Sequence, residues 1–135
     1  ATKPEEIYLA LIESVAFGTK TIVDLFEKGG IKISECFAGG GIAVKNKLLM
    51  QIFADVTGKE IKVTDCTQAG AVGSAIFAAA ATGIYGDIKD TVKKLGRSCS
   101  TEYVPNYENT QKYSAAYERY KKFSELFAKE IKHYF

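Results

Sequence analysis

The sequence predicts an α/β fold with two parallel strands and several helices, and three observations support that prediction. Apolar residues recur at helical spacing over residues 2–28 and again over 44–56, as in amphipathic helices. Two short segments with β-branched residues, 31–37 and 61–65, flank the second of these helices. Because two strands joined through a helix run parallel, we expect a parallel pair with a right-handed crossover.

The first predicted helix is long and has signals at both ends. Thr2-Lys3-Pro4-Glu5 has the capping-box pattern, with proline at an early helical position. Gly29-Gly30 follows Lys28 and ends the helix, because glycine adopts the left-handed conformation that closes many helices. The apolar positions that define this helix are Ile7, Leu11, Val15, Ile22 and Phe26.

A strand, a helix and a second strand follow. Residues 31–37 are expected to form a strand whose first half is solvated, since it carries lysine, serine and glutamate. Residues 44–56 form an amphipathic helix that Gly58 closes. Residues 61–65 alternate between apolar and polar side chains, which predicts the second strand.

Residues 68–82 consist mostly of alanine and glycine, with sizeable apolar side chains only at Val72, Ile76 and Phe77. Small side chains let a helix approach its neighbour closely, and we favour such packing over a direct contact with a ligand. A brief surface helix is then expected from Asp87 to Gly96, followed by an extended segment over 98–105.

The last element is a long C-terminal helix that Pro105-Asn106 introduces. Its aromatic and apolar residues recur at spacings of three, four or seven, which places them in one stripe. We predict that this stripe packs in the core and does not stack on bases. Its members are Tyr113, Tyr117, Tyr120, Phe127, Ile131 and Tyr134.

Composition limits the class of protein. The 135 residues include 47% hydrophobic and 25% charged residues and carry a net charge of +2, as in one soluble globular domain or a piece of one. Lysines alternate with acidic residues, which argues against a nucleic-acid partner. The longest apolar stretch is too short to span a membrane and no signal peptide is evident, so we expect a cytoplasmic protein with no membrane partner.

Two strands do not make a self-sufficient sheet. A parallel pair normally lies inside a larger sheet that is covered on both faces. The sequence therefore predicts the C-terminal portion of a bigger domain, and its exposed sheet edge allows self-association.

Residue types that often carry catalysis form no constellation in this sequence. An odd number of dispersed cysteines predicts reduced structural thiols, with neither a disulfide framework nor a zinc site, and these are Cys36, Cys66 and Cys99. His133 is expected at the surface. Solvated or capping roles are expected for the four obvious carboxylates, which are Asp55, Asp65, Asp87 and Asp90.

The most informative segment is 36–46, where a short apolar run meets Gly39-Gly40-Gly41 and then a helix. Glycines let a phosphate or nucleotide approach the backbone, and free N–H groups at a helix start favour negative charge. A strand also turns on glycine for steric reasons alone, so the motif leaves both interpretations open. A nicotinamide site fits less well, because the third glycine of G-x-G-x-x-G is missing and the first helix precedes the strand.

Taken together, the motifs resemble the C-terminal end of the FGGY carbohydrate kinases, over nearly the whole chain. Within that family the pattern is most similar to the kinases that act on L-ribulose. The matching motifs include Gly40-Gly41-Ile42-Ala43, Leu48-Leu49-Met50-Gln51-Ile52, Ala54-Asp55-Val56-Thr57-Gly58, Gly73-Ser74-Ala75-Ile76-Phe77-Ala78-Ala79 and Tyr103-x-Pro105-Asn106.

The resemblance implies an actin-like, ribonuclease-H-type ATPase fold in which two domains close over ATP and a sugar. Residues 1–135 would be the C-terminal portion of the second, nucleotide-side domain, without the N-terminal sugar-binding domain. The implied reaction transfers the γ-phosphoryl group of ATP, with Mg²⁺, to the pentulose L-ribulose and gives L-ribulose 5-phosphate, a step of arabinose catabolism.

The resemblance also implies where nucleotide binds. Gly40 and Gly41 correspond to glycines on the adenosine side of the ATP site, and Asn46 to a polar residue near the adenine. Lys45 takes the place of Asn46 if the register shifts by one, and Gly39 is a weaker candidate. No residue matches the family's catalytic aspartate or sugar-binding residues, so we expect the chain alone to be inactive.

Two other functions stay open on the sequence. The parent protein could be another kinase of the family, acting on xylulose, glycerol or gluconate. Alternatively, the chain could be a non-enzymatic interaction or assembly module that uses its uncovered apolar surface.

Overall fold

The computed structural model describes residues 1–131, which form six helices and a three-stranded sheet. The elements along the chain are α1 (Pro4–Lys28), β1 (Glu35–Ala38), α2 (Gly41–Lys45), α3 (Lys47–Thr57), β2 (Glu60–Thr64), α4 (Ala69–Thr82), α5 (Ile88–Leu95), β3 (Cys99–Tyr103) and α6 (Tyr107–Ile131). The predicted α/β class is confirmed. No helix within residues 1–131 is long and apolar enough to cross a membrane.

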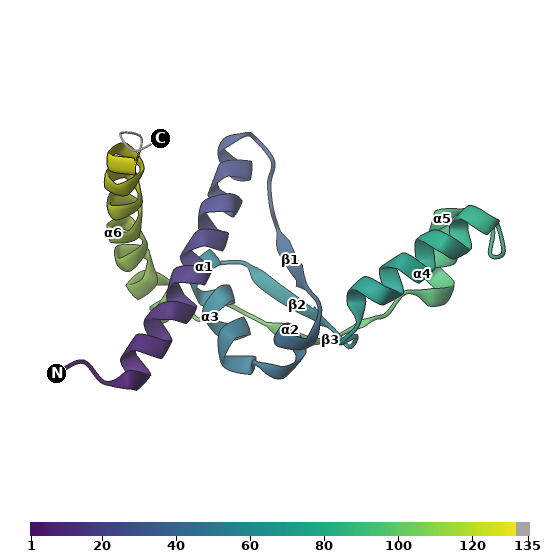
Figure 1. The fold of residues 1–135 in the computed structure, drawn as a ribbon, viewed down its shortest axis with the longest axis horizontal. Coiled ribbons are helices and arrows are strands. Elements are labelled where there is room, and N and C mark those ends of the chain that lie inside the picture. Colours follow the sequence, from purple (N-terminus) through teal and green to yellow (C-terminus); the bar gives the residue numbers. More distant parts are fainter. Residues whose placement is uncertain (132–135) are drawn as a thin grey trace.

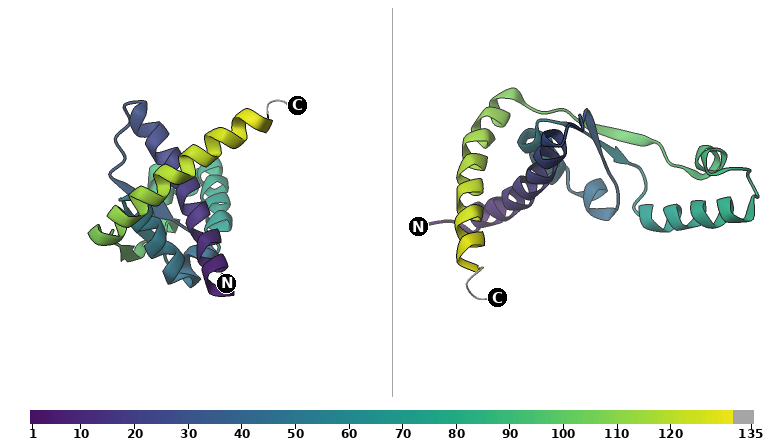
Figure 2. Two further views of the ribbon diagram at one scale, coloured as in Figure 1. Left: turned by 90° about the vertical axis from the view of Figure 1, so that its left-hand side faces the viewer. Right: turned by 90° about the horizontal axis from the view of Figure 1, so that it is seen from above.

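The molecule has a body and an arm (Figure 1). The body contains the sheet together with α1, α2, α3 and α6. The arm consists of α4 and α5, which lie side by side and extend away from the body, as the view from above also shows (Figure 2). The sheet joins the two parts, since α4 follows β2 and α5 precedes β3.

The strand order in the sheet is β1-β2-β3. The predicted parallel pair is confirmed: β1 and β2 run parallel, with Cys36 opposite Ile61 and Ala38 opposite Val63. The segment expected to be extended over 98–105 contributes β3, which pairs antiparallel with β2 as a third strand. The sequence predicts only two strands, because an antiparallel partner this far along the chain has no local signal.

One face of the sheet is covered by helices. Ala43 of α2 and Met50 and Ala54 of α3 form a buried cluster with Ile61 and Val63 of β2. Alternation along a strand places the next side chains on the opposite face.

The opposite face of the sheet carries charge. There Lys62 of β2 forms ion pairs with Glu35 of β1 at 2.5 Å and with Glu102 of β3 at 3.9 Å. The sheet is thus buried on the side of α3, and on the other side it exposes these charged residues together with Phe37.

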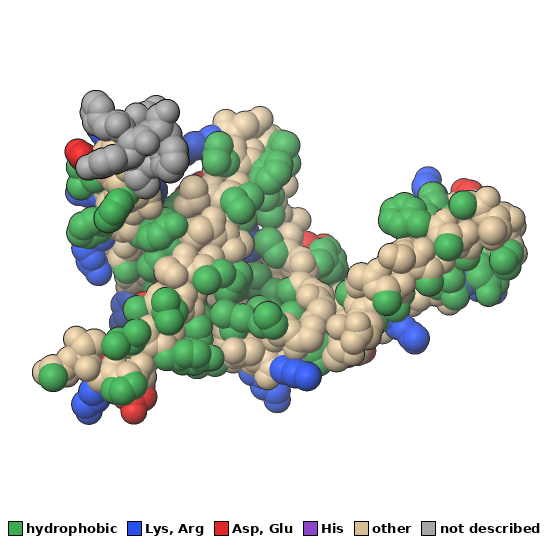
Figure 3. Space-filling model, viewed as in Figure 1, with side chains coloured by type: hydrophobic (Ala, Val, Ile, Leu, Met, Phe, Trp, Pro, Cys, Tyr) green, Lys and Arg blue, Asp and Glu red, His purple; other side chains and the backbone are tan. Residues whose placement is uncertain are grey.

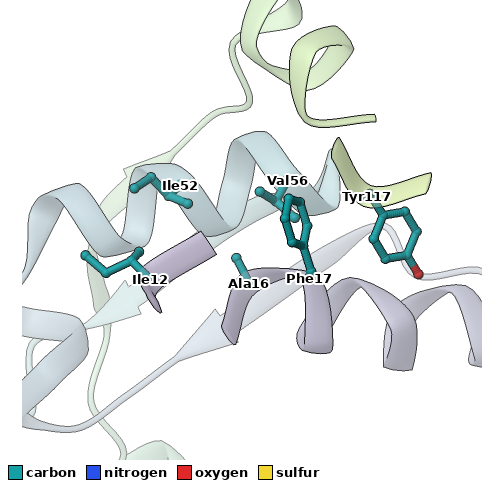
Figure 4. Close-up of a cluster of buried hydrophobic side chains, with 6 residues drawn as sticks. All are labelled: Ile12, Ala16, Phe17, Ile52, Val56 and Tyr117. Atoms are coloured by element: carbon teal, nitrogen blue, oxygen red, sulfur yellow. The ribbon is translucent and has the colours of Figure 1, made fainter. Parts of the chain in front are cut away.

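A second buried cluster joins three helices. Figure 4 shows Ile12, Ala16 and Phe17 of α1 pointing toward Ile52 and Val56 of α3, with Tyr117 of α6 beside them. Tyrosine rings of α6 surround the Phe17 ring at centroid distances of 5.5 to 6.2 Å. This cluster forms because α1, α3 and α6 each present an apolar stripe at helical spacing.

The predicted aromatic stripe of α6 is only partly buried. Tyr113, Tyr117 and Tyr120 pack against Phe17, as predicted. Phe127 is exposed, so that part of the prediction is wrong. The reason is that α6 diverges from α1 toward its C-terminal end, which opens a groove between them (Figures 1 and 2). The Ile131 side chain and Tyr134 lie outside the described residues, as does His133.

The expectation that Asp55 is solvated or caps a helix is wrong. Asp55 is only 2% exposed, and its carboxylate accepts three hydrogen bonds. The backbone N–H of Asn106 donates to Oδ1 at 2.8 Å, the Asn109 amide to Oδ2 at 2.9 Å, and the Gln51 amide to Oδ1 at 2.8 Å. Asp55 therefore fixes the start of α6 onto α3.

The other carboxylates described by contacts behave as predicted. Asp87 is the N-cap of α5, and its Oδ1 accepts a hydrogen bond from the Asp90 N–H at 2.9 Å. Asp90 is exposed and pairs with Lys93 at 3.3 Å.

Two helix boundaries differ from the predictions. The N-cap of α1 is Lys3, whose N–H donates to Glu6 at 2.8 Å, one residue later than the predicted capping box. The helix predicted over 44–56 is two helices, because the Asn46 side chain accepts a hydrogen bond from the Leu49 N–H and starts α3 anew.

Candidate functional site

The glycine turn lies at the carboxyl end of β1. Because β1 and β2 are parallel and in register, the turn after Ala38 lies next to the end of β2 at Thr64. Ligands of open α/β sheets bind at such carboxyl ends. The turn therefore has the position of a binding site.

Two of the three glycines have structural explanations. A Cβ atom on Gly39 would lie 3.3 Å from the Ala69 Cβ and 3.3 Å from the Thr64 hydroxyl, so a side chain there would require the turn or the start of α4 to shift by a few tenths of an ångström. Gly40, the N-cap of α2, has φ of +95°, which L side chains rarely adopt.

Gly41 has neither explanation. Its φ lies outside the left-handed range, and a Cβ atom built on it would meet no other atom of the described chain within 4 Å. Gly41 is also the first residue of α2, where other residues are tolerated at least as well as glycine. The backbone at Gly41 is thus open to an approaching molecule.

Short helix α2 separates the two groups of predicted site residues. Gly40 and Gly41 lie at its start, and Lys45 and Asn46 at its end. Five residues of helix rise about 7 Å, so a ligand of nucleoside size could touch both ends. With only five residues, α2 has a weak macrodipole. Attraction of a negatively charged ligand would therefore depend mainly on the backbone N–H groups of the turn.

Lys45 and Asn46 offer different chemistry at the end of α2. Lys45 is exposed and offers a mobile positive charge. The Asn46 side-chain oxygen already accepts a hydrogen bond from the Leu49 N–H at 3.0 Å. What Asn46 can still offer is its NH₂ group, a donor suited to a ring nitrogen or a carbonyl oxygen.

Thr64 is a site residue that the sequence motifs do not indicate. Its hydroxyl oxygen is buried beside the turn, and it finds no hydrogen-bond partner among the residues that the structure describes. A buried hydroxyl without a partner is uncommon. The only sequence signal was its place at the carboxyl end of the second parallel strand.

The arm shows only part of the close packing predicted for residues 68–82, because α4 packs against α5 but has no other close helical neighbour among the described residues. Ala69 contacts the turn, but α4 has no buried residue, and Gly70 and Gly73 would meet nothing within 4 Å among the described residues if they carried a Cβ. Among the described residues, α4 is therefore packed on the face toward α5 only, and its other faces lack the close neighbour that the sequence predicts.

Metal-ligating side chains do not cluster among the described residues. Within residues 1–131, no group of three or more His, Cys, Asp or Glu side chains comes together as a metal site. Cys36 lies on β1 before the turn, and burial raises the pKa of its thiol, with Lys59 opposing the shift. Cys36 is therefore a protonated structural thiol at neutral pH.

A comparison with known proteins shows the family to which this chain belongs. A sequence model described as "FGGY family of carbohydrate kinases, C-terminal domain" matches residues 1–82, which include the glycine turn and all of α4. The chain belongs to the FGGY family. The predicted resemblance is therefore confirmed.

Within the FGGY family, the chain is similar to ribulokinases. It is 45% identical over 134 residues to the ribulokinase of Bacillus licheniformis, a match that covers 96% of this chain and 24% of that protein. It is 47% identical over 123 residues to the ribulokinase of Halalkalibacterium halodurans, covering 88% and 22%. The chain thus spans about a quarter of the length of the curated relatives it matches.

Solved structures of FGGY kinases share the fold. A ligand-bound xylulose kinase from Lactobacillus acidophilus aligns with a TM-score of 0.75 at 21% identity, over 91% of this chain and 24% of that one. Plasmodium falciparum glycerol kinase with ADP aligns with a TM-score of 0.70 at 26% identity, over 90% and 24%.

Proposed function

We propose that this chain forms the adenosine side of the ATP site of a sugar kinase that phosphorylates L-ribulose. Relatives named ribulokinase, at 37 to 47% identity, support ribulose over the other sugars of the family. Gluconate and xylulose kinases are similar to the chain in structure at 21% identity, which supports only a shared fold. A glycerol kinase is similar in structure at 26% identity. A kinase for one of those sugars is the second candidate.

The observation that carries the proposal is the open backbone at Gly41. Nothing within the described chain requires glycine there, whereas a nucleotide that lies against the turn would. Gly40 is proposed to shape the turn, and Gly39 to let it pack on α4. Asn46 is the proposed donor near the adenine, with Lys45 as its alternative.

In this proposal the chain's residues position the nucleotide, and the chemistry occurs elsewhere. In-line phosphoryl transfer needs a carboxylate to accept the hydroxyl proton, and Mg²⁺ to offset the phosphate charge. We assign neither role to residues 1–131. The chain is thus proposed to be the C-terminal portion of the nucleotide-side domain of an actin-like kinase in the cytoplasm, and to be inactive without the sugar-binding domain.

A pair of glycine variants tests the proposal by calorimetric titration with ADP and ATP. Gly41→Ala and Gly73→Ala both add a methyl group where there is space and an ordinary φ, so neither should lower the melting temperature, and Gly73→Ala, inside α4, should raise it by a few degrees. Gly41→Ala should weaken ADP binding at least tenfold, and Gly41→Val should weaken it further. Gly73→Ala should leave it unchanged. ADP binding that Gly41→Val does not change would refute the proposed site.

The same variants belong in a complete kinase. Replacing the matched region of the Bacillus licheniformis ribulokinase by this chain gives a full-length chimera in which turnover can be measured. Gly41→Ala should raise the KM for ATP at least tenfold and leave the KM for L-ribulose within twofold. An unchanged KM for ATP in the Gly41→Ala chimera would contradict the proposed site.

A further inference from the structure

The ends of three strands meet at the edge of the sheet that carries the glycine turn. Strands β1 and β2 are parallel, so their carboxyl ends at Ala38 and Thr64 lie next to each other. Strand β3 runs antiparallel to β2, and its first residue, Cys99, lies opposite Thr64. The Asp65 N–H donates to the Ser98 carbonyl oxygen at 3.3 Å, which continues this pairing beyond the strands. The residues just before β3 therefore lie at the same edge as the turn.

A cavity of about 180 Å³ lies at this edge, at the base of the arm. One of its walls is the side of α4 between Ala69 and Ile76, and another is the pair Gly96-Arg97. Thr64 also lines the cavity, and its hydroxyl would lie 3.3 Å from a Cβ atom on Gly39, so the cavity begins beside the glycine turn. Pockets that enclose a whole drug-sized ligand measure roughly 300 to 1,000 Å³. This cavity has room for one part of a nucleotide only.

Arg97 is the cation of this cavity. It is the one charged residue among those that line the cavity in the described chain. In Figure 3 a basic side chain lies at the surface where the arm leaves the body. The lysines at 20, 59 and 62 each pair with a carboxylate, whereas Arg97 forms no ion pair within residues 1–131. Its charge and its hydrogen-bond donors are therefore available to a ligand.

The chemistry of the cavity favours a phosphate group. A guanidinium group presents a planar fork of N–H donors that matches two oxygens of one phosphate. Val72 and Ile76 give the cavity an apolar wall, and such a wall strengthens the attraction between opposite charges by lowering the local dielectric constant. The Thr64 hydroxyl, without a partner in the described chain, adds a donor between the turn and the cavity.

The proposed nucleotide site gives this cavity a role. The proposed adenosine contacts, Gly41 and Asn46, lie at the two ends of α2, and the turn joins the start of α2 to the edge where the cavity lies. We propose that Arg97 is a phosphate-binding residue of the nucleotide site, whose guanidinium donates to phosphate oxygens while the adenosine lies against α2. This inference rests on the proposed function and adds a residue to it.

Arg97 comes from a different part of the chain than the glycine motif. The family model ends at residue 82, before α5 and β3. Residue 97 lies inside the match to the Bacillus licheniformis ribulokinase, which covers 96% of this chain. The proposed contact depends on the antiparallel pairing of β2 with β3, because that pairing brings Arg97 to the edge with the turn.

Calorimetric titration of the chain with ADP and with adenosine tests this contact. Arg97→Gln should weaken ADP binding about fivefold and leave adenosine binding within about twofold, since adenosine has no phosphate. Arg119→Gln is the matched control, because Arg119 is equally classed as exposed but lies on α6 in the body. It should change neither affinity. At about 0.5 M KCl the difference between the wild-type chain and Arg97→Gln should shrink, as it does for a contact between charges.

Two further measurements exclude a merely structural role. Both arginines are exposed, so both glutamine variants should keep the wild-type melting temperature within about 2 °C. Arg97→Lys keeps the charge without the fork, and it should lose less ADP affinity than Arg97→Gln. An equal loss of ADP and adenosine binding in Arg97→Gln would mean that Arg97 only shapes the site, and would overturn the inference.

Gly41→Val separates this inference from the proposed function. If Gly41→Val abolishes ADP binding and Arg97→Gln leaves it unchanged, the nucleotide site stands and the role of Arg97 is refuted. If the unmodified chain binds no ADP, or if Gly41→Val binds it normally, the proposed function fails and this inference fails with it.

Discussion

The body and the arm are both rich in apolar residues, yet they use them differently. In the body, Phe17, Ile52 and Tyr117 come from three helices and bury one another. In the arm, α4 is almost entirely alanine, glycine and a few larger apolar residues, and none of its residues is buried. This difference shows that the size and spacing of apolar side chains, more than their number, decide which segment forms a core.

The physical reason lies in the area that each side chain can bury. A large apolar side chain removes enough surface from water to contribute about 1.5 to 3 kcal/mol, whereas alanine offers a single methyl group. Alanine is nevertheless the best helix former. Helix α4 can therefore be helical without a core, and Gly83 in the left-handed conformation closes it.

The sharpest test of this comparison is a pair of phenylalanine truncations. Phe17→Ala should lower the free energy of unfolding by about 3 to 5 kcal/mol, because it leaves a cavity among α1, α3 and α6. Phe77→Ala on α4 should lower it by less than about 0.5 kcal/mol, since that side chain is 72% exposed. Urea denaturation measures both. Similar losses for the two variants would show that the arm is packed in solution.

A somewhat smaller effect should come from the carboxylate that ties α3 to α6. Asp55→Ala should lower the free energy of unfolding by about 3 kcal/mol, because it leaves the Asn106 N–H and the Asn109 amide without their acceptor. Asp90→Ala, in the arm, removes an exposed carboxylate and should cost less than about 0.5 kcal/mol. Chemical denaturation of both variants, with Asp55→Asn as an intermediate case, measures the difference. A loss for Asp55→Ala no larger than that for Asp90→Ala would contradict the buried network.

The smallest expected effect is a pH dependence that belongs to the body. Burial raises the pKa of Tyr113 to about 12 from its usual 10.0, and the charge of Glu13 adds to the shift. Between these two pH values the unfolded chain loses the phenolic proton and the folded chain keeps it, so stability falls as pH rises. Tyr113→Phe should therefore lose less stability than the wild-type chain between pH 10 and 12.

Thermal unfolding at several pH values, with tyrosinate absorbance as a second readout, checks this expectation. Wild-type and Tyr113→Phe chains should show the same pH dependence below pH 9, because the phenol is protonated in both states there. Parallel curves up to pH 12 would mean that Tyr113 is solvated and that this part of the body is looser than described.

Local signals predicted most of the element order. Gly58 closes α3 in the left-handed conformation, as its place after a helical pattern indicated, and Gly83 closes α4 in the same conformation. The division of the helix predicted over 44–56 was missed because the Asn46 cap interrupts an apolar pattern that is otherwise continuous. Within the candidate site, the glycine motif was visible in the sequence, whereas Thr64 became a candidate only once its buried hydroxyl had a location.

The α/β class, the parallel pair and the FGGY family can be predicted from the sequence alone, because periodicity, glycine positions and motif spacing are all properties of neighbouring residues. The burial of Asp55, the exposure of Phe127 and the extension of α4 from the body are visible only in the tertiary structure. It also decided which of three adjacent glycines lacks an internal explanation, namely Gly41. Each of these depends on what comes close from a distant part of the chain, and the local pattern of a sequence carries no record of that.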